Sequence, residues 1–346
     1  MLRFSSFLRC LAFATTAVFC TSGWLHAQDY RTRSRSKTPR EAKQAAEAAM
    51  PVGQDYLKGR YLTVGLQLGA VQYRGDLAPR LFASAKKPLW GSTSGLQVTK
   101  RVHPYVTLRA DLSWARLRGD DYFKANPFDA EERRRYLRNA NFRNSLKELA
   151  VTAAIDVLPV DDWLMRPLLM PYALIGVGVF HHNPRVWLDG EWVNAAPLGT
   201  EGQHADNAAE KGYPTPYKRV QVSVPLGLGV RYRLTPQLEL SGEATYRFTT
   251  TDYLDDVSGT FADPRDLSPE ARRLVNRSAA RSASGASRGL ATLLGNDQQI
   301  QQMTLDGETY DYVPTFFQRG NARGTTSGND GYVAFLIRLS YVLFSD

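Results

Sequence analysis

Residues 219–248, RVQVSVPLGLGVRYRLTPQLELSGEATYRF, carry the clearest structural signal in this chain. Apolar residues occupy alternate positions from Val220 to Leu234, and the alternation resumes at Leu238 and runs to Phe248. Because successive side chains of a β-strand point to opposite faces, the pattern predicts two strands joined by a tight turn. One face of this hairpin meets an apolar medium and the other a polar one.

The same alternation recurs along the chain and predicts eight strands. Each is long enough for the ~9–11 residues that a tilted membrane strand needs. The strands are predicted at about 61–73, 91–102, 104–117, 144–157, 170–181, 219–233, 236–248 and 331–343.

Short and long connections alternate between these strands, which predicts their orientation. Short turns join them near 103–104, 159–162 and 235–236, and bacterial barrels keep such turns in the periplasm and their longer loops outside. We therefore predict an all-β fold, a transmembrane antiparallel up-and-down β-barrel of about eight strands over 59–346, with both termini periplasmic. The four long extracellular loops are predicted at about 74–90, 118–143, 182–218 and 249–330.

The N-terminus has the layout of a secretory signal peptide over 1–27. Arg3 and Arg9 precede an apolar run at 11–20, and a small residue, Ala27, ends the predicted cleavage site. No later segment offers ~20 consecutive apolar residues for a spanning helix. The sequence thus predicts an exported protein in the outer membrane of a Gram-negative bacterium, with outer-membrane lipid as its surroundings.

Residues 28–58 form a basic, alanine-rich arm predicted to lie in the periplasm. Thr38 and Glu41 have capping-box spacing, which favours a short helix to about Ala49. Two interpretations stay open, a docking segment for a periplasmic partner and a solvated leader. We expect no nucleic-acid partner, because an exported chain does not meet one and the basic run lacks interleaved aromatic residues.

The cysteine content excludes several functions. The chain has two cysteines, Cys10 and Cys20, and both lie in the predicted signal peptide. Disulfides, cysteine zinc sites and thiol catalysis are therefore not expected in the mature protein.

The polar face of the predicted barrel is rich in charge. Side chains in the interior of an eight-stranded barrel just fill it, and buried charges persist when they are paired. A packed network of ion pairs is the expected structure, and a proton or ion path is the alternative. The predicted network consists of Arg109, Asp111, Glu148, Asp156, Arg231, Arg233, Glu239, Glu243, Arg247 and Arg338, with Arg101 on the same face.

Several motifs resemble one family. The segments 71–79 (VQYRGDLAP), 176–184 (GVGVFHHNP), 197–203 (PLGTEGQ) and 251–258 (TDYLDDVS) look like the DUF6089 outer-membrane barrels of the Bacteroidota, and the matches span about 62–343. That family includes PorG, a barrel of the type IX secretion system associated with the periplasmic ring of PorK and PorN. The resemblance implies a structural or assembly role in protein secretion, with periplasmic ring proteins and lipoproteins of the PorK/PorN kind as partners.

The longest loop contains clustered carboxylates. Asp252, Asp255 and Asp256 are candidate calcium ligands, because hard cations take several oxygen ligands. Their spacing is not that of an EF-hand, and turn residues or partners of loop arginines are the alternative. Residues 268–270 predict the start of a helix in this loop. No other metal and no cofactor is expected.

Nothing in the sequence indicates an enzyme. Ser/His/Asp catalysis needs a histidine with an orienting partner, and adjacent His181 and His182 would point to opposite faces of a strand. The alternatives to the secretion role are a narrow channel or solute-binding barrel and a surface adhesin.

Overall fold

The computed structural model describes residues 61–78, 89–126, 128–160, 166–275, 277, 301–312, 318–325 and 328–343. The chain divides into two compact units, Met1–Gly53 and Gln54–Asp346, and the described residues all belong to the second. The predicted signal peptide 1–27 and arm 28–58 lie outside the described residues.

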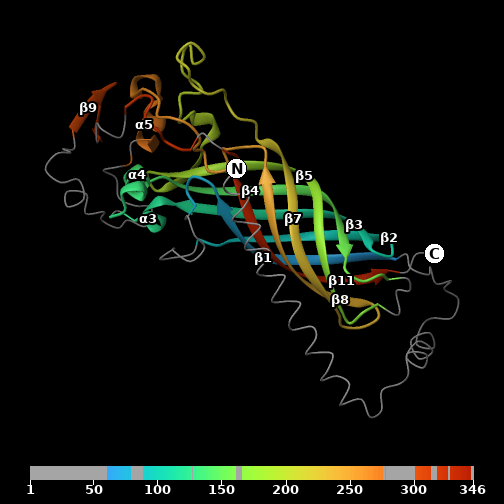
Figure 1. Ribbon diagram of the computed structural model, residues 1–346. Helices are drawn as coiled ribbons and strands as arrows, with labels where there is room; N and C mark the ends of the chain where they lie inside the picture. Colours follow the sequence, from blue (N-terminus) through green and yellow to red (C-terminus); the bar gives the residue numbers. More distant parts are fainter. Residues whose placement is uncertain are drawn as a thin grey trace, which may run out of the picture. The chain divides into compact units, whose positions relative to one another are not determined.

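Eight long antiparallel strands within the described ranges close into a barrel (Figure 1). The first and last of them pair from Leu62↔Leu343 to Arg74↔Gly331, so the sheet has no open edge there. The predicted fold class is confirmed. The strands are β1 Leu62–Arg74, β2 Gly91–His103, β3 Val106–Asp120, β4 Asn141–Asp156, β5 Leu169–Leu188, β7 Val220–Arg233, β8 Leu238–Thr249 and β11 Gly331–Leu343.

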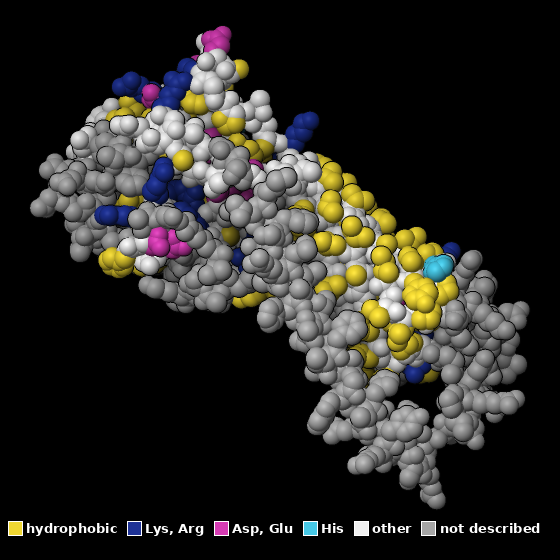
Figure 2. All heavy atoms as spheres, in the orientation of Figure 1, with side chains coloured by type: hydrophobic (Ala, Val, Ile, Leu, Met, Phe, Trp, Pro, Cys, Tyr) yellow, Lys and Arg dark blue, Asp and Glu magenta, His cyan; other side chains and the backbone are white. Residues whose placement is uncertain are grey.

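The alternating residues divide between the two faces of the barrel as the sequence predicts. Outward apolar side chains are well exposed, among them Leu68 (67%), Ile337 (64%), Leu149 (59%) and Val220 (58%). Figure 2 shows hydrophobic side chains over the barrel strands. An exposed apolar belt around a closed barrel is the surface that a lipid bilayer requires.

Two predicted loops are shorter than expected. Strand β5 continues to Leu188 and forms a hairpin with β6 (Glu191–Asn194), so the predicted loop 182–218 begins later. Strands β3 and β4 also extend, which shortens the predicted loop 118–143. The alternation of apolar residues ends where the belt ends, but the backbone pairing continues past it.

Short elements lie in the remaining long connections, and Figure 1 shows the helices at one end of the barrel. The predicted helix start at 268–270 is confirmed by α5. None of the helices in the described part has the length and hydropathy to cross a membrane. The elements are α3 Asp121–Lys124, α4 Ala130–Arg138, η2 Ala196–Leu198, η3 Pro264–Asp266, α5 Pro269–Val275, β9 Gln301–Leu305 and β10 Glu308–Tyr312.

Candidate functional site

A cluster of four buried charges crosses the middle of the barrel. Arg109 Nη1 lies 2.7 Å from Glu243 Oε2, and Arg109 Nε lies 2.8 Å from Asp111 Oδ2. Arg338 joins the same two acids, with Nη1 2.5 Å from Asp111 Oδ1 and Nη2 3.0 Å from Glu243 Oε1. Tyr172 donates a further hydrogen bond to Glu243, at 2.9 Å. Two arginines and two carboxylates thus form a neutral, buried group.

The position of this cluster blocks the lumen. Strands β3 and β8, which carry Arg109 and Glu243, lie four places apart in the closed order of eight strands and therefore face each other. Their ion pair spans the width of the interior. A buried pair costs much to separate, because each charge alone would lie in a medium of low polarity.

A second ion pair lies farther toward the long loops. Arg247 Nε contacts Glu148 Oε2 at 2.8 Å, and Ser223 donates to the other carboxylate oxygen at 2.6 Å. All three side chains are buried.

A third group lies toward the short turns. Asp156 pairs with Arg101 and, at 2.8 Å, with Arg231. Arg166, in the β4–β5 connection, contacts Glu239 at 3.3 Å. The sequence did not indicate Arg166, because residues in a turn follow no strand alternation.

The structure places nine of the ten predicted network residues in these three groups. The tenth, Arg233, lies half-buried at the end of β7, opposite Glu239 in the register. The network is therefore a stack of separate groups along the barrel axis. Most of its arginines form ion pairs with acids on other strands, and these pairs stabilise the contacts between the strands across the lumen.

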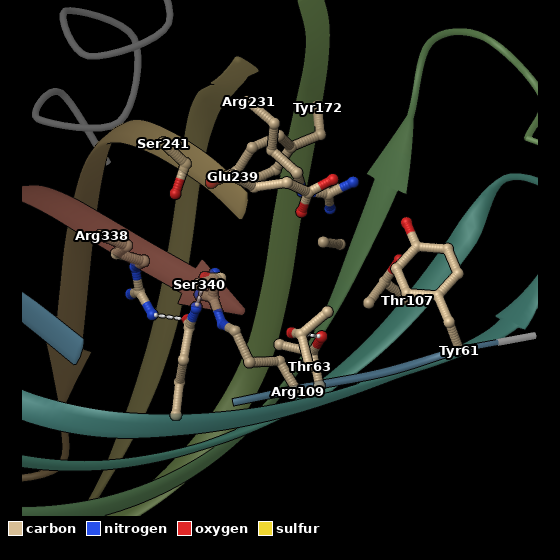
Figure 3. A pocket seen from close by; sticks show the side chains of 13 residues that line it. Tyr61, Thr63, Thr107, Arg109, Tyr172, Arg231, Glu239, Ser241, Arg338 and Ser340 are labelled. Carbon is tan, nitrogen blue, oxygen red and sulfur yellow. Dashed lines mark hydrogen bonds between the residues drawn. The ribbon is translucent and has the colours of Figure 1, made fainter. Parts of the chain in front are cut away.

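A small cavity lies at the short-turn end of the interior (Figure 3). Its volume of about 30 Å³ holds about two water molecules. Arg231 stacks over the Tyr172 ring at 4.4 Å, and the central cluster closes the cavity's inner side. The cavity is lined by Tyr61, Thr63, Gln97, Thr99, Thr107, Arg109, Ala154, Tyr172, Arg231, Glu239, Ser241, Arg338 and Ser340.

An apolar plug fills the opposite end of the interior, which the sequence analysis did not predict. Tyr73 and Phe142 contact edge to face, with ring centroids 4.8 Å apart, and Leu254 from the loop after β8 is fully buried against them. The signal available in the sequence is that inward positions near these strand ends are apolar. The plug comprises Val71, Tyr73, Leu77, Ala78, Ala115, Leu117, Phe142, Leu146, Phe180, Leu254, Val257, Tyr332, Ala334 and Leu336.

Two carboxyl groups share one phenol at the outer edge of the plug. The Tyr73 hydroxyl lies 2.6 Å from both Asp255 Oδ2 and Asp330 Oδ1. Burial raises the pKa of both carboxyls well above the usual range, and the charge of Asp76 adds to the effect on Asp255. Because the phenol has a single proton, the second short contact requires a protonated carboxyl.

The candidate calcium ligands do not converge. Asp255 accepts from Tyr73 and from backbone amides, including that of Val257 at 3.0 Å. Asp256 instead accepts from Tyr217 at 2.8 Å. Asp252 is half-buried. Among the described residues, no group of three or more His, Cys, Asp and Glu side chains is arranged to hold a metal.

The long connections form a packed layer around a second buried acid. Glu201 is fully buried, accepts from the amides of Ser258 (2.9 Å) and Gly259 (3.1 Å), and pairs with Arg323 at 3.0 Å. Arg323 also reaches Asp256 at 3.7 Å. Three segments distant in sequence, one in the β6–β7 connection and two in the connection between β8 and β11, are thereby fixed to one another.

Comparisons with known proteins found distant structural similarities. No family model and no curated protein matches the chain. Among solved structures, Neisserial surface protein A is similar at 10% identity and a TM-score of 0.33, covering 82% of this chain and 96% of its own. A major outer membrane protein from Thermus thermophilus has 11% identity and a TM-score of 0.33, covering 82% of this chain and 99% of its own. OprG from Pseudomonas aeruginosa has 10% identity and a TM-score of 0.30, covering 84% of this chain and 99% of its own. The assignment of the fold rests on the strand pairing.

Proposed function

We propose that this chain is an outer-membrane barrel that acts as a structural component of a protein secretion complex of the type IX kind. In this role the short turns and the arm 28–58 contact periplasmic ring proteins and lipoproteins similar to PorK and PorN. The observation that carries the proposal is the filled interior. A barrel whose lumen holds a cross-barrel ion pair and an apolar plug is suited to anchoring rather than to transport.

The filled lumen argues against the channel alternative. The cavity of about 30 Å³ ends at the central ion pairs, and the apolar plug lies beyond them. A solute would have to separate several buried ion pairs in order to pass.

One observation favours a second candidate, a surface-binding role. The connections that carry Glu201, Asp256 and Arg323 form a layer held by buried polar contacts. A preordered surface of this kind binds a partner with little loss of conformational freedom.

Site-specific photo-crosslinking in intact cells tests the proposal. A photoreactive residue would replace exposed Tyr105 in the β2–β3 turn or Thr235 in the β7–β8 turn. The matched control position is Glu191, exposed in the β5–β6 hairpin at the other end of the barrel. We expect both turn positions to capture periplasmic proteins of a secretion ring and the hairpin position to capture none.

Capture from Glu191 alone would contradict the secretion role and support the surface-binding one. Cell fractionation and heat-modifiable gel mobility accompany each variant, so that a misfolded barrel is recognised. A folded protein in the soluble periplasm would contradict the membrane placement itself.

A further inference from the structure

The outer face of β3, β4 and β5 carries a cluster of exposed cations, which we call the basic patch. It consists of the exposed side chains of Arg116, Arg118, Arg143, Lys147 and Arg185. They share the outward face with the lipid-facing residues of the same strands. The patch is therefore on the outer wall of the barrel and separate from the interior network.

The register brings like charges directly opposite one another. Arg118 pairs with Arg143, and Arg143 pairs with Arg185, so three arginines form one row across three strands. Directly opposed side chains in an antiparallel sheet have Cβ atoms ~4.5–5.5 Å apart, and like charges there are destabilising.

No carboxylate in the described part of the chain forms an ion pair with any patch residue. This distinguishes the patch from the barrel interior, where arginines such as Arg109, Arg247 and Arg338 all contact acids. A row of arginines that has no ion pair to a described carboxylate is the arrangement expected for an external anion.

Neighbouring side chains hold two of the arginines in place. Arg143 stacks over the Trp192 ring at 4.2 Å, and Arg185 Nε donates to Asn194 Oδ1 at 3.1 Å. Both partners lie on β6, and Trp192 itself packs against Trp187 at 5.4 Å. The strand extension past the membrane belt, with its hairpin, thus orders the patch.

The height of the patch along the strands identifies the layer that it faces. Trp114, 41% exposed, lies opposite Lys147 in the register, and Leu149 begins the apolar belt two residues farther along β4. Arg118 lies four residues beyond Trp114, which is ~13 Å along a tilted strand. Tryptophan marks the membrane interface, so the patch lies at headgroup level on the side of the long loops.

We propose that the basic patch binds the phosphate groups of the anionic glycolipid that forms the outer leaflet of the membrane. Guanidinium groups bind phosphate through two parallel hydrogen bonds, and a row of three matches a polyanionic headgroup layer. This inference rests on the outer-membrane placement in the proposed function. It adds a lipid partner on the barrel wall to the periplasmic protein partners.

The test measures binding of the full-length mature protein in mild detergent to intact lipid A and to the same lipid with its phosphates removed. The wild-type barrel is expected to prefer the intact lipid. The triple variant R118Q/R143Q/R185Q is expected to bind it about 100-fold more weakly and to lose the preference. The control K100Q/R134Q/R265Q removes three exposed cations elsewhere and is expected to keep the preference.

Equal affinities of the wild-type and triple variant for intact lipid A would overturn the inference. Full displacement of the lipid by millimolar inorganic phosphate would also overturn it, since the site would then take a free ion. Capture of an acidic protein without discrimination between the lipids would assign the patch to a protein partner instead. If the folded wild type fractionates outside the outer membrane, the proposed function fails as well. If the wild type fractionates with the outer membrane and the triple variant keeps the preference for intact lipid A, only this inference fails.

Discussion

Single residues in the barrel interior act through pairing, so the loss of one charge affects its partners. Glu243 accepts from Arg109, Arg338 and Tyr172. Without it, two buried guanidinium groups would share Asp111 alone, which leaves one positive charge uncompensated. A buried unpaired charge is among the few single-residue changes that destabilise a protein strongly.

We expect Glu243→Leu to lower the free energy of unfolding by about 3–5 kcal/mol. Urea unfolding in detergent micelles, followed by tryptophan fluorescence, measures the change. Glu191→Leu is the control, because Glu191 is exposed and its replacement is expected to change stability by less than about 0.5 kcal/mol. A similar small change for Glu243→Leu would mean that water or rearrangement neutralises the cluster.

The shared phenol predicts a pH dependence in the outer loops. The pKa of Asp330 is raised above the ordinary carboxyl value by burial and then by Asp255. The folded loop, in which Asp330 is buried, therefore binds a proton that the locally unfolded loop releases. The free energy that favours the folded loop is expected to decrease as the pH rises from about 4 toward the raised pKa. Asp330→Asn removes one of the two carboxyls and should make the dependence shallower, while Asp255 keeps its own contribution.

The Leu254 amide donates to Asp330 Oδ2 at 2.9 Å, so its hydrogen exchange measures how often the folded loop opens. Protection, corrected for the intrinsic exchange rate, is expected to fall with pH in the wild type. A wild-type protection that rises over the same range would contradict the assigned sign.

Among the structural elements, the segment after β8 has an unusual role. It returns to the mouth of the barrel and places Leu254 and Val257 in the apolar plug, while Asp255 and Asp256 between them bind the two polar clusters. The segment therefore contributes both to the plug and to the loop layer. It joins the transmembrane part to the loops.

Leu254→Ala should loosen this segment while the barrel stays closed. Removing a buried leucine costs ~2–5 kcal/mol, part of which is the cavity left behind. Hydrogen exchange within 251–258 is expected to accelerate, and that of β3 and β4 to stay unchanged. Leu66→Ala, which removes a side chain 60% exposed on the lipid side, is the matched control. Equal acceleration in the strands would show that the plug also stabilises the barrel.

Across the whole molecule, the interior is filled in layers from one end to the other. A small cavity lies at the short-turn end, ion-paired groups follow, and the apolar plug closes the outer end. Each layer blocks passage for a different reason. Ions would meet the apolar plug, and apolar solutes would meet the charges.

This layering predicts an absence of conductance in planar bilayers. The wild type is expected to give no steps, and so is Arg109→Ser/Glu243→Ser, because the plug remains. Adding a replacement of 251–258 by a Gly/Ser linker removes only Leu254 and Val257 from the plug, so we expect still no current steps, because the plug residues on the strands and the Arg247–Glu148 pair remain. Steady wild-type steps would support the channel alternative.

The pattern of residues along the chain was enough to predict the closed barrel, its strands and the inward face of the network charges, because alternation with a period of two is a local property. Which charges meet depends on how the strands close around the lumen. The partners of Glu243 come from β3, β5 and β11, brought together by closure, and Arg166 comes from a turn without alternation. The predicted calcium ligands do not meet, for the same reason. Asp255 and Asp256 are adjacent in sequence, but in the folded loop their side chains face separate clusters. The basic patch likewise depends on the register, since opposed arginines are defined by pairing between strands.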